Sequence, residues 1–331
     1  MNEKDLQKAL GALAPLYADP TVTEICVDAY DRVYVDRGEK LEDVASPFTS
    51  AEALSGVIEA VLALGDVALG PDKTSGEVLF PDGSRFLAVV PPTAISGPCF
   101  VLRKLTRQLT WDQVFERGAV SREAYELLKS ALDSRVNVLL AGGTGSGKTT
   151  LTALLIESIP AGERVIVAEP IYEVHVRHQR SIHLAGRGLV DVPFEEILFT
   201  AARMRPDWLV VGELCGGEAA FALQIFGQGH TGLANMHATS VEDALARLEA
   251  MCLMANLGLG LGEIRRLIAS AFQLVTYQQR LSDGRRRLTH IVELRGVENE
   301  RYVLQPLFRY NPAEDQIEAT GVQPSWEKQA E

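Results

Sequence analysis

A glycine-rich segment in the middle of the chain has the spacing of a phosphate-binding loop. It matches the pattern G-x-x-x-x-G-K-S/T, and its residues are Gly142, Gly143, Thr144, Gly145, Ser146, Gly147, Lys148 and Thr149, followed by Thr150. Glycines let backbone N–H groups turn inward around phosphates, and the start of a following helix adds favourable partial charge. Lys148 would reach the β- and γ-phosphates of ATP, and the Thr149 hydroxyl would bind Mg²⁺. The alternative is a loop with a purely structural role.

A carboxylate, Glu213, is the second candidate for chemistry. It follows the apolar run Trp208–Val211 and Gly212, so it would emerge at the carboxyl end of a strand. Ligands of open α/β sheets bind at that edge, where this side chain could orient or deprotonate a water molecule that attacks phosphate. A helix-capping or surface glutamate is the alternative interpretation.

The elements that would position these residues alternate between strands and helices. This alternation predicts a parallel sheet that helices cover on both faces. The expected strands are Val136–Ala141, Arg164–Ala168, Trp208–Val211 and Leu233–His237, and the expected helices are Thr149–Ser158, Phe194–Met204 and Glu218–Phe226. Near the end, Leu274–Arg280 and Arg286–Leu294 flank Asp283-Gly284, a strong signal for a β-hairpin.

The first hundred residues have a different pattern of apolar residues. Short runs in which apolar and polar residues alternate predict strands, and one stretch in which apolar residues recur at helical spacing predicts a helix. Together they indicate a small α+β domain. The expected elements are strands Glu24–Asp28, Arg32–Asp36, Arg85–Val90 and Cys99–Arg103, with one helix at Ser50–Leu64. The predicted division is an N-terminal domain at 1–105, a linker at 106–120, a P-loop domain at 121–310 and a C-terminal tail at 311–331.

Length and composition restrict the class of protein. A chain of 331 residues is long enough for two domains, each with its own core. The formal charge of −12 argues against direct binding to nucleic acid or to anionic lipid. Four distant cysteines give no zinc or disulfide pattern, and no apolar stretch is long enough to span a membrane. We therefore expect a cytoplasmic protein that meets a membrane only peripherally, through a partner.

Several blocks in a fixed order make the chain resemble the type II/type IV secretion ATPases, and most closely the CpaF/TadA branch that powers tight-adherence pili. The matching segments are Pro81–Arg85, Val90–Pro92, Gly97–Pro98 through Leu102–Lys104, the phosphate-loop motif, Ala201–Asp207, Val211–Glu213, Gly216–Ala219, and Gly229–Gly232 through Met236–Thr239. This resemblance implies a RecA-like C-terminal domain, a homo-hexameric ring with ATP between subunits, and a platform partner in the inner membrane.

The resemblance also implies roles for three further side chains. His230 and His237 would lie near the γ-phosphate, and Glu169 would be the acidic-box glutamate, although Glu169 or Glu173 could each be an ordinary loop acid. From their residue type alone, Arg85 and Arg103 are candidates for stabilising charge on phosphate, from the same or a neighbouring subunit. Each could equally be a solvated partner in an ion pair.

Two positions depart from the family pattern. Pro170 stands where the family has aspartate, and Cys215 stands where it has arginine. Proline lacks a carboxylate and a backbone donor, and a thiol cannot supply the charge of a guanidinium. The Arg285-Arg286-Arg287 cluster is predicted to be a solvated hairpin face or a partner contact.

These features lead to one main hypothesis and two alternatives. The main hypothesis is an ATP-hydrolysing motor subunit of a tight-adherence pilus or a type II/IV secretion system. The alternatives are a nucleotide-binding scaffold with low turnover and a DNA-transfer relative of the same superfamily. The retained Lys148 and Glu213 argue against the scaffold, and the acidic charge argues against DNA handling.

Overall fold

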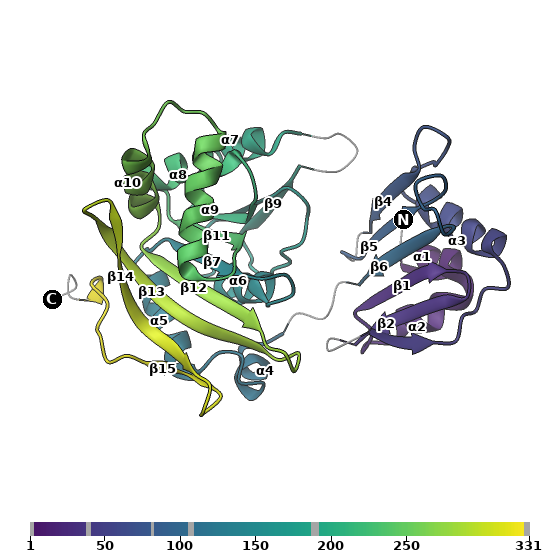
Figure 1. Ribbon diagram of the computed structural model, residues 1–331, viewed down its shortest axis with the longest axis horizontal. Coiled ribbons are helices and arrows are strands. Elements are labelled where there is room, and N and C mark those ends of the chain that lie inside the picture. The colour runs from purple at the N-terminus through teal and green to yellow at the C-terminus, as the bar shows by residue number, and fades with distance from the viewer. Residues whose placement is uncertain (1–2, 38–40, 81–82, 105–108, 187–191, 328–331) are drawn as a thin grey trace. The chain divides into compact units, whose positions relative to one another are not determined.

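The computed structural model describes residues 3–37, 41–80, 83–104, 109–186 and 192–327. The chain divides into two compact units, Met1–Arg107 (unit 1) and Gln108–Glu331 (unit 2) (Figure 1). Pro81 and Asp82, which contribute to the family resemblance, lie outside the described residues. The same holds for 106–108 of the expected linker and 328–331 of the expected tail.

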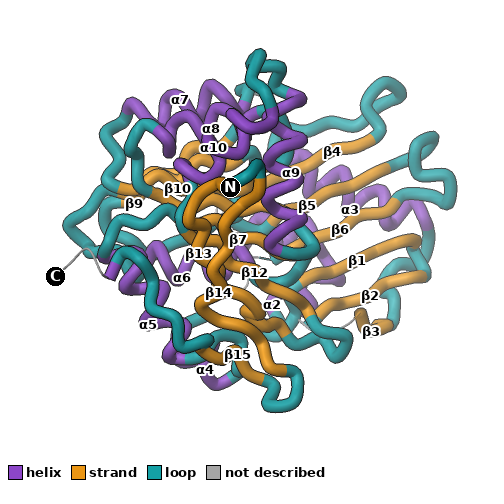
Figure 2. Tube along the Cα trace, turned by 60° about the vertical axis from the view of Figure 1, so that its left-hand side comes forward, coloured by secondary structure: helices purple, strands orange, loops and turns teal. Residues whose placement is uncertain are grey.

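Unit 1 is an antiparallel sheet of six strands, which Figure 2 shows side by side. In sheet order the strands are β3 (Leu41–Val44), β2 (Arg32–Asp36), β1 (Glu24–Ala29), β6 (Cys99–Arg103), β5 (Arg85–Val89) and β4 (Ser75–Leu79). Its helices are α1 (Glu3–Leu10), the short 3₁₀ turn η1 (Gly11–Leu13), α2 (Ala14–Ala18) and α3 (Ala51–Ala63).

Helix α3 shows how local sequence determines an element of unit 1. The Ser50 side chain accepts a hydrogen bond from the Ala53 N–H at 3.3 Å and caps the first turn. Leu54 and Ile58 recur at helical spacing and are fully buried. They pack in one core with alternate residues of the strands, such as Phe86 of β5. The α+β character predicted for this region is therefore confirmed.

Unit 2 is a nine-stranded sheet with a parallel part and an antiparallel extension. In sheet order the strands are β15 (Gln316–Ala319), β14 (Arg301–Asn311), β13 (Arg286–Glu298), β12 (Leu274–Arg280), β7 (Val138–Gly142), β11 (Gly232–His237), β10 (Trp208–Leu214), β8 (Val165–Glu169) and β9 (Ser181–Ala185). Strands from β12 to β9 run parallel, and β13 to β15 add antiparallel neighbours.

The helices of unit 2 cover both faces of this sheet (Figure 1). They are α4 (Trp111–Glu116), α5 (Arg122–Asp133), α6 (Lys148–Glu157), α7 (Phe194–Arg203), α8 (Glu218–Gly227), α9 (Val241–Met254) and α10 (Leu261–Ala271). Along β7, Leu139 packs in the core with α7 to α10, whereas Val138 and Leu140 pack with α5 and α6. Because both faces are buried, central strands are continuously apolar, which confirms the predicted α/β class.

Two segments of unit 2 contain more structure than the sequence indicated. Within the segment expected as a linker lies helix α4, whose first turn carries a capping box between Thr110 and Gln113. Within the expected tail, β15 pairs with β14, and the buried Trp326 donates from Nε1 to Ser130 Oγ at 3.3 Å. Among the residues that the structure describes, no helix has the length and apolar character needed to cross a bilayer.

Candidate functional site at the carboxyl edge of the unit 2 sheet

The loop 142–149 connects β7 to α6 at the carboxyl edge of the parallel strands. Gly145 and Gly147 have left-handed backbone angles, with φ of 68° and 100°. A side chain on Gly142 has no room, because a Cβ there would lie 2.4 Å from the Gln278 carbonyl oxygen. Thr149 and Thr150 are partly exposed in the first turn of α6, which has no side-chain cap. The loop therefore needs its glycines, and its helix start keeps N–H groups available for an anion.

Lys148 lies buried in this loop, with only 8% of its surface exposed. Its Nζ donates to the carbonyl oxygens of Gly142 and Gly143, at 2.9 Å each, and lies 3.3 Å from His237 Nδ1. Burial lowers the pKa of Lys148, whereas the negative charges of Glu213 and Glu173 raise it. The ammonium is thus placed among oxygen acceptors and near two carboxylates.

Glu213 and His237 extend this arrangement across neighbouring strands. Glu213 lies near the end of β10, His237 is the last residue of β11, and these strands pair in parallel. His237 Nε2 lies 3.0 Å from Glu213 Oε1, and its other ring nitrogen faces Lys148. The imidazole therefore bridges the lysine of the loop and the carboxylate of β10.

Glu169, the last residue of β8, is in a different environment. It is only 2% exposed, and its Oε1 accepts hydrogen bonds from the N–H groups of Glu173 (3.2 Å) and Val174 (2.9 Å). Burial raises the pKa of Glu169 to about 8. The two N–H bonds lower the pKa, but by less than burial raises it. Its Cγ occupies the space beside Gly212, where a Cβ would lie 2.4 Å away. At neutral pH this side chain is a protonated acid.

The structure does not bring His230 to the loop. His230 precedes β11, and its carbonyl accepts a hydrogen bond from Asn137 Nδ2 at 3.2 Å, just before β7 begins. His237 lies at the other end of β11, so the two histidines are separated by the length of the strand, roughly 20 Å. Within one chain, only His237 therefore lies beside the glycine-rich loop.

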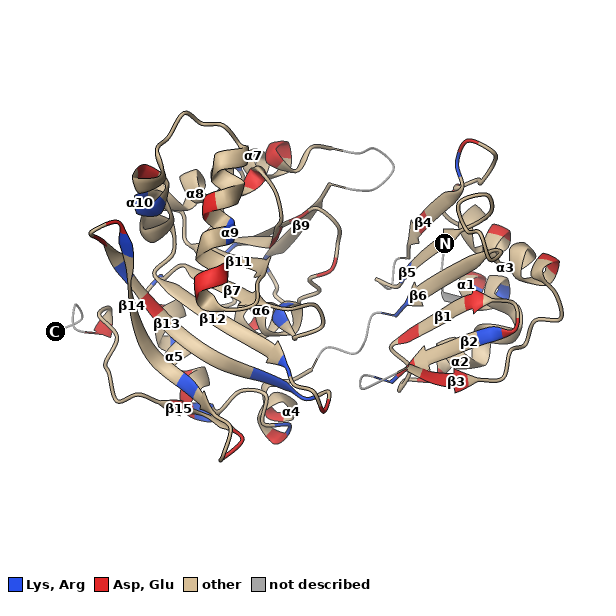
Figure 3. Cartoon of the chain, in the orientation of Figure 1, with Lys and Arg blue, Asp and Glu red and all other residues tan. Residues whose placement is uncertain are grey.

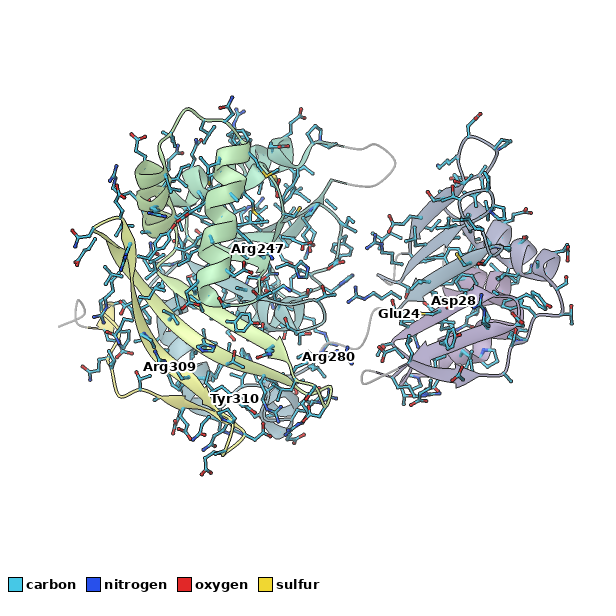
Figure 4. The ribbon with its side chains drawn as sticks, in the orientation of Figure 1. Glu24, Asp28, Arg247, Arg280, Arg309 and Tyr310 are labelled. Carbon is cyan, nitrogen blue, oxygen red and sulfur yellow. The ribbon has the colours of Figure 1, made fainter. Side chains whose placement is uncertain are left out.

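The two candidate arginines lie in unit 1 on neighbouring strands. Arg85 of β5 is directly opposite Arg103 of β6, and Arg103 is opposite Glu24 of β1. Arg85 forms an ion pair with Glu77, while Arg103 is exposed. Directly opposite residues of paired strands point to the same face, so Glu24, Arg103 and Arg85 share one face of the sheet, and Figure 4 labels Glu24. Arg85 is thus paired within its own sheet, as the alternative interpretation expected.

The prediction of a solvated hairpin face or a partner contact for the cluster Arg285-Arg286-Arg287 is wrong for Arg287. Arg287 is 4% exposed and donates to both carboxylate oxygens of Asp315. Arg286 Nε donates to the carbonyl oxygen of Gly145, inside the glycine-rich loop, at 2.8 Å. Sequence reasoning missed this contact with the loop, although a basic residue directly after a predicted hairpin turn was a visible signal.

The two departures from the family pattern occupy ordinary loop positions. Cys215 is exposed after β10, and its N–H donates to Glu218 Oε1 at 2.7 Å. Although the residue is exposed, partial desolvation of its sulfur, followed by the charges of Glu218 and Glu213, raises the pKa of the Cys215 thiol to about 11. The thiol is therefore neutral and supplies no positive charge. Pro170 directly follows Glu169.

Several polar atoms at this edge fit a phosphate-bearing ligand with Mg²⁺. Among the described residues, Ser146 Oγ, Glu169 Oε2 and Gln278 Oε1 are buried without a hydrogen-bond partner, although buried polar groups are normally paired. Mg²⁺ keeps several waters and binds few protein oxygens, and Thr149 offers such an oxygen beside the loop. Thr152 Oγ1 donates to the buried Asn235 Oδ1 at 2.7 Å and joins α6 to β11 behind the site.

Known proteins are similar in sequence to this chain. The family model described as "Type II/IV secretion system protein" matches residues 7–302. The putative conjugal transfer protein Rv3659c of Mycobacterium tuberculosis is 33% identical over 302 residues, covering 87% of this chain and 85% of that protein. The conjugal transfer protein TrbB of Rhizobium radiobacter is 29% identical over 311 residues, covering 90% and 92%.

Among solved structures, the pilus retraction motor PilT with bound ADP has a TM-score of 0.58 and 16% sequence identity, and the match covers 94% of this chain and 83% of that one. At this identity the likeness concerns the fold. It agrees with the RecA-like architecture that the sequence predicted for unit 2.

Proposed function

Because the chain belongs to the type II/IV secretion system protein family and is therefore an ATPase of a secretion system, we propose that ATP is hydrolysed at the carboxyl edge of the unit 2 sheet. The observation that carries this proposal is the continuous contact from Lys148 through His237 to Glu213. It joins the glycine-rich loop to a carboxylate at the end of a neighbouring parallel strand.

The loop 142–149 would bind the phosphates of ATP. Its backbone N–H groups and the start of α6 would face the phosphate oxygens, and Lys148 would exchange its present carbonyl acceptors for the β- and γ-phosphates. Thr149 would hold Mg²⁺, with the Thr150 hydroxyl beside it in the same helical turn. When bound, this ion supplies charge neutralisation on the phosphate oxygens.

Glu213 would orient the attacking water and accept its proton. The His237 ring fixes the carboxylate through the 3.0 Å contact, so that one oxygen remains available toward the substrate. Glu169 is a poor base at neutral pH, because its pKa of about 8 keeps it protonated. Its unpartnered Oε2 would instead donate a hydrogen bond, and Glu173 would contribute negative charge near Lys148.

The finer assignments extend the proposal to the assembly. The subunit would work in a homo-hexameric ring at the inner face of the cell membrane, docked on an inner-membrane platform protein. Arg103, which is exposed, would supply charge to ATP bound by a neighbouring subunit, and Arg85 would do so only after leaving Glu77. Within the family, we propose the tight-adherence pilus branch.

A steady-state ATPase assay of the purified chain, with protein concentration varied, tests both the enzyme and the ring. Specific activity should rise steeply with concentration if subunits complete each other's sites. A constant specific activity in an active enzyme would contradict the shared site. Absence of turnover at every concentration, together with retained ATP binding, would favour the scaffold with low turnover instead.

A DNA-transfer machine is the second candidate, because two relatives carry the name conjugal transfer protein. Deleting the gene from the source organism should abolish pilus assembly if the tight-adherence proposal is right. Loss of DNA transfer with normal pili would favour the second candidate. Direct DNA handling would appear as binding that weakens steeply with salt, which the charge of −12 disfavours.

A further inference from the structure

The hairpin formed by β12 and β13 extends beyond the strand that leads into the glycine-rich loop. Strand β12 pairs with β7 up to Gln278 opposite Gly142, where β7 ends, and then continues to Arg280. Across the hairpin, Arg280 lies directly opposite Arg286 of β13. Figure 3 shows basic residues gathered at this end of the hairpin, and Figure 4 labels Arg280 at the end of β12.

Arg286 contacts the part of the loop where the backbone is left-handed. Its Nε donates to the Gly145 carbonyl oxygen at 2.8 Å, a charge-assisted hydrogen bond. Its Cδ lies 3.5 Å from the place where a Cβ on Gly147 would be. The guanidinium of Arg280 is also close, with one nitrogen 3.9 Å from the corresponding place on Gly145. The hairpin therefore forms an outer support for the loop.

The bond to Gly145 constrains the direction of a neighbouring donor. In a trans peptide the C=O and the following N–H point to opposite sides of the chain. Fixing the Gly145 carbonyl toward Arg286 therefore turns the Ser146 N–H away from the hairpin. In this structure the Ser146 N–H donates to the Gly143 carbonyl oxygen inside the loop, with an N···O distance of 3.3 Å, and a phosphate oxygen would replace that acceptor. One external contact thus determines which groups face the interior.

The strand that carries Arg286 is itself anchored. Successive side chains of a strand point to opposite faces, so Arg287 faces away from the loop. Besides its two bonds to Asp315, Arg287 donates to the carbonyl oxygen of Arg117 at 2.9 Å, next to the end of α4. Arg285 shares this direction, but its ion pairs with Asp283 and Asp315 are exposed to solvent and contribute little to holding the strand. Arg286 is therefore held on a backbone fixed from its other side.

We propose that Arg286 is a positioning residue for nucleotide binding: it holds the Gly145–Ser146 peptide with its N–H toward the phosphates. This inference rests on the proposed ATP site. Since the N–H groups of such a loop serve the phosphates that ADP and ATP have in common, the residue sets the affinity for both nucleotides equally. It does not take part in the cleavage of the γ-phosphate.

Removing the guanidinium should therefore weaken binding without slowing the chemical step. A hydrogen bond to a charged group contributes enough that Arg286→Ala should lower the affinity for ADP and for ATP by about tenfold or more. KM for ATP should rise by a similar factor, while kcat stays within about twofold, as expected when uniform binding is lost. Arg286→Lys, which keeps a charged donor of similar length, should recover part of the affinity.

Calorimetric titration of the full chain with ADP and with a non-hydrolysable ATP analogue, together with steady-state kinetics, tests this. Arg285→Ala is the matched control, because it removes the same charge from the adjacent residue on the opposite face. A thermal melt of each variant shows whether the fold is retained. If Arg286→Ala does not fold, the nucleotide affinity of Arg286→Lys still measures the effect of changing the guanidinium.

The outcomes separate the two proposals. If the unmodified chain binds no nucleotide, the proposed function fails. If it binds nucleotide and Arg286→Ala behaves like Arg285→Ala, the positioning role is overturned while the ATP site stands. A loss of affinity for the ATP analogue only, with reduced kcat and normal ADP binding, also overturns it, because that pattern indicates direct contact with the γ-phosphate.

Discussion

The two ends of the parallel strands in unit 2 use polar residues in opposite ways. At the amino end, Asn137 is buried and fully paired. Its Nδ2 donates to the carbonyls of His230 (3.2 Å) and Ala271 (2.8 Å), and its Oδ1 accepts from the Gly232 N–H at 2.7 Å. Its backbone N–H donates to Gln273 Oε1 at 3.1 Å. One amide thus ties three segments of the fold together.

The carboxyl end contains buried polar atoms that this chain does not satisfy. Ser146 Oγ, Glu169 Oε2 and Gln278 Oε1 have no partner among the described residues, and burial shifts the pKa values of Lys148 downward and Glu169 upward. Unpaired buried groups destabilise a fold, so three of them at this edge, together with two shifted pKa values, are typical of a site that binds something. The comparison therefore separates residues that stabilise the fold from residues that serve function, and mutations at each end test this separation.

The largest effect is expected for Lys148→Ala at the carboxyl end. No neutral side chain can replace the ammonium charge near the phosphates, so ATP hydrolysis should fall below detection and ATP affinity should drop. The fold should remain, because burial opposes the charge of Lys148 in the native state. Steady-state ATPase assays and a thermal melt measure both properties. Normal hydrolysis in this variant would disprove the role of the loop.

Glu213→Gln should give the next largest effect. The amide keeps the size of the side chain but cannot accept a proton from water, so turnover should fall at least roughly a hundredfold. ATP affinity should remain close to that of the unmodified chain, since the change concerns the transition state. Glu169→Gln is the matched control from the neighbouring strand β8. A larger loss of turnover in that control would exchange the roles of the two glutamates.

Asn137→Ala, at the amino end, should lower stability and leave turnover unchanged, which is the reverse of the result expected at the carboxyl end. It leaves the Gly232 N–H and two carbonyl groups without their partner, which should lower the free energy of unfolding by about 2–4 kcal/mol. At a temperature where the variant is folded, turnover per molecule should be unchanged. Chemical denaturation and an ATPase assay at low temperature check the two statements. Lost turnover in a well-folded variant would remove the distinction between the two ends.

The raised pKa of Glu169 makes the stability of the fold depend on pH. Its folded value of about 8 exceeds that of an ordinary glutamate, so the folded state holds one proton more between the two values. Stability from this group is therefore fully present below the unfolded pKa and is lost as pH rises through 8, by up to about 1.4 kcal/mol per pH unit.

Glu169→Gln provides the test, because glutamine imitates the neutral acid and does not titrate. Relative to this variant, the unmodified chain should lose stability as the pH rises from about 5 to about 8 and change little above that, as measured by urea denaturation at each pH. Parallel pH profiles for the two proteins would mean that the carboxyl group is not protonated in the folded state.

The sequence predicted those parts of the site that local patterns determine. Strands β2 and β6 and the segment β12 were predicted with their observed bounds, because apolar alternation and turn residues lie next to each other in the chain. The burial of Arg287 could not be predicted, since its partner Asp315 follows 28 residues later on another turn. The raised pKa of Glu169 likewise depends on the approach of Gly212 from a neighbouring strand.

The separation of His230 from His237 within one chain could be predicted from the sequence. His230 precedes the apolar run of β11 and His237 ends it, so a parallel strand between them places the two rings at opposite edges of the sheet.

We therefore expect the smallest effect from His230→Ala. The side chain lies outside the chain of contacts from Lys148 to Glu213, and only its backbone carbonyl bonds to Asn137, which alanine preserves. Turnover at saturating ATP and ATP affinity should each change by less than about twofold, the size expected of a substitution remote from the site. His237→Ala is the matched control at the other end of the same strand, and it should slow hydrolysis by a much larger factor because Glu213 loses its 3.0 Å contact. Kinetics measured at several protein concentrations distinguish one further case. If His230→Ala reduces turnover only where subunits assemble, the histidine acts across a subunit boundary. The amino end of the sheet would then serve function as well as stability.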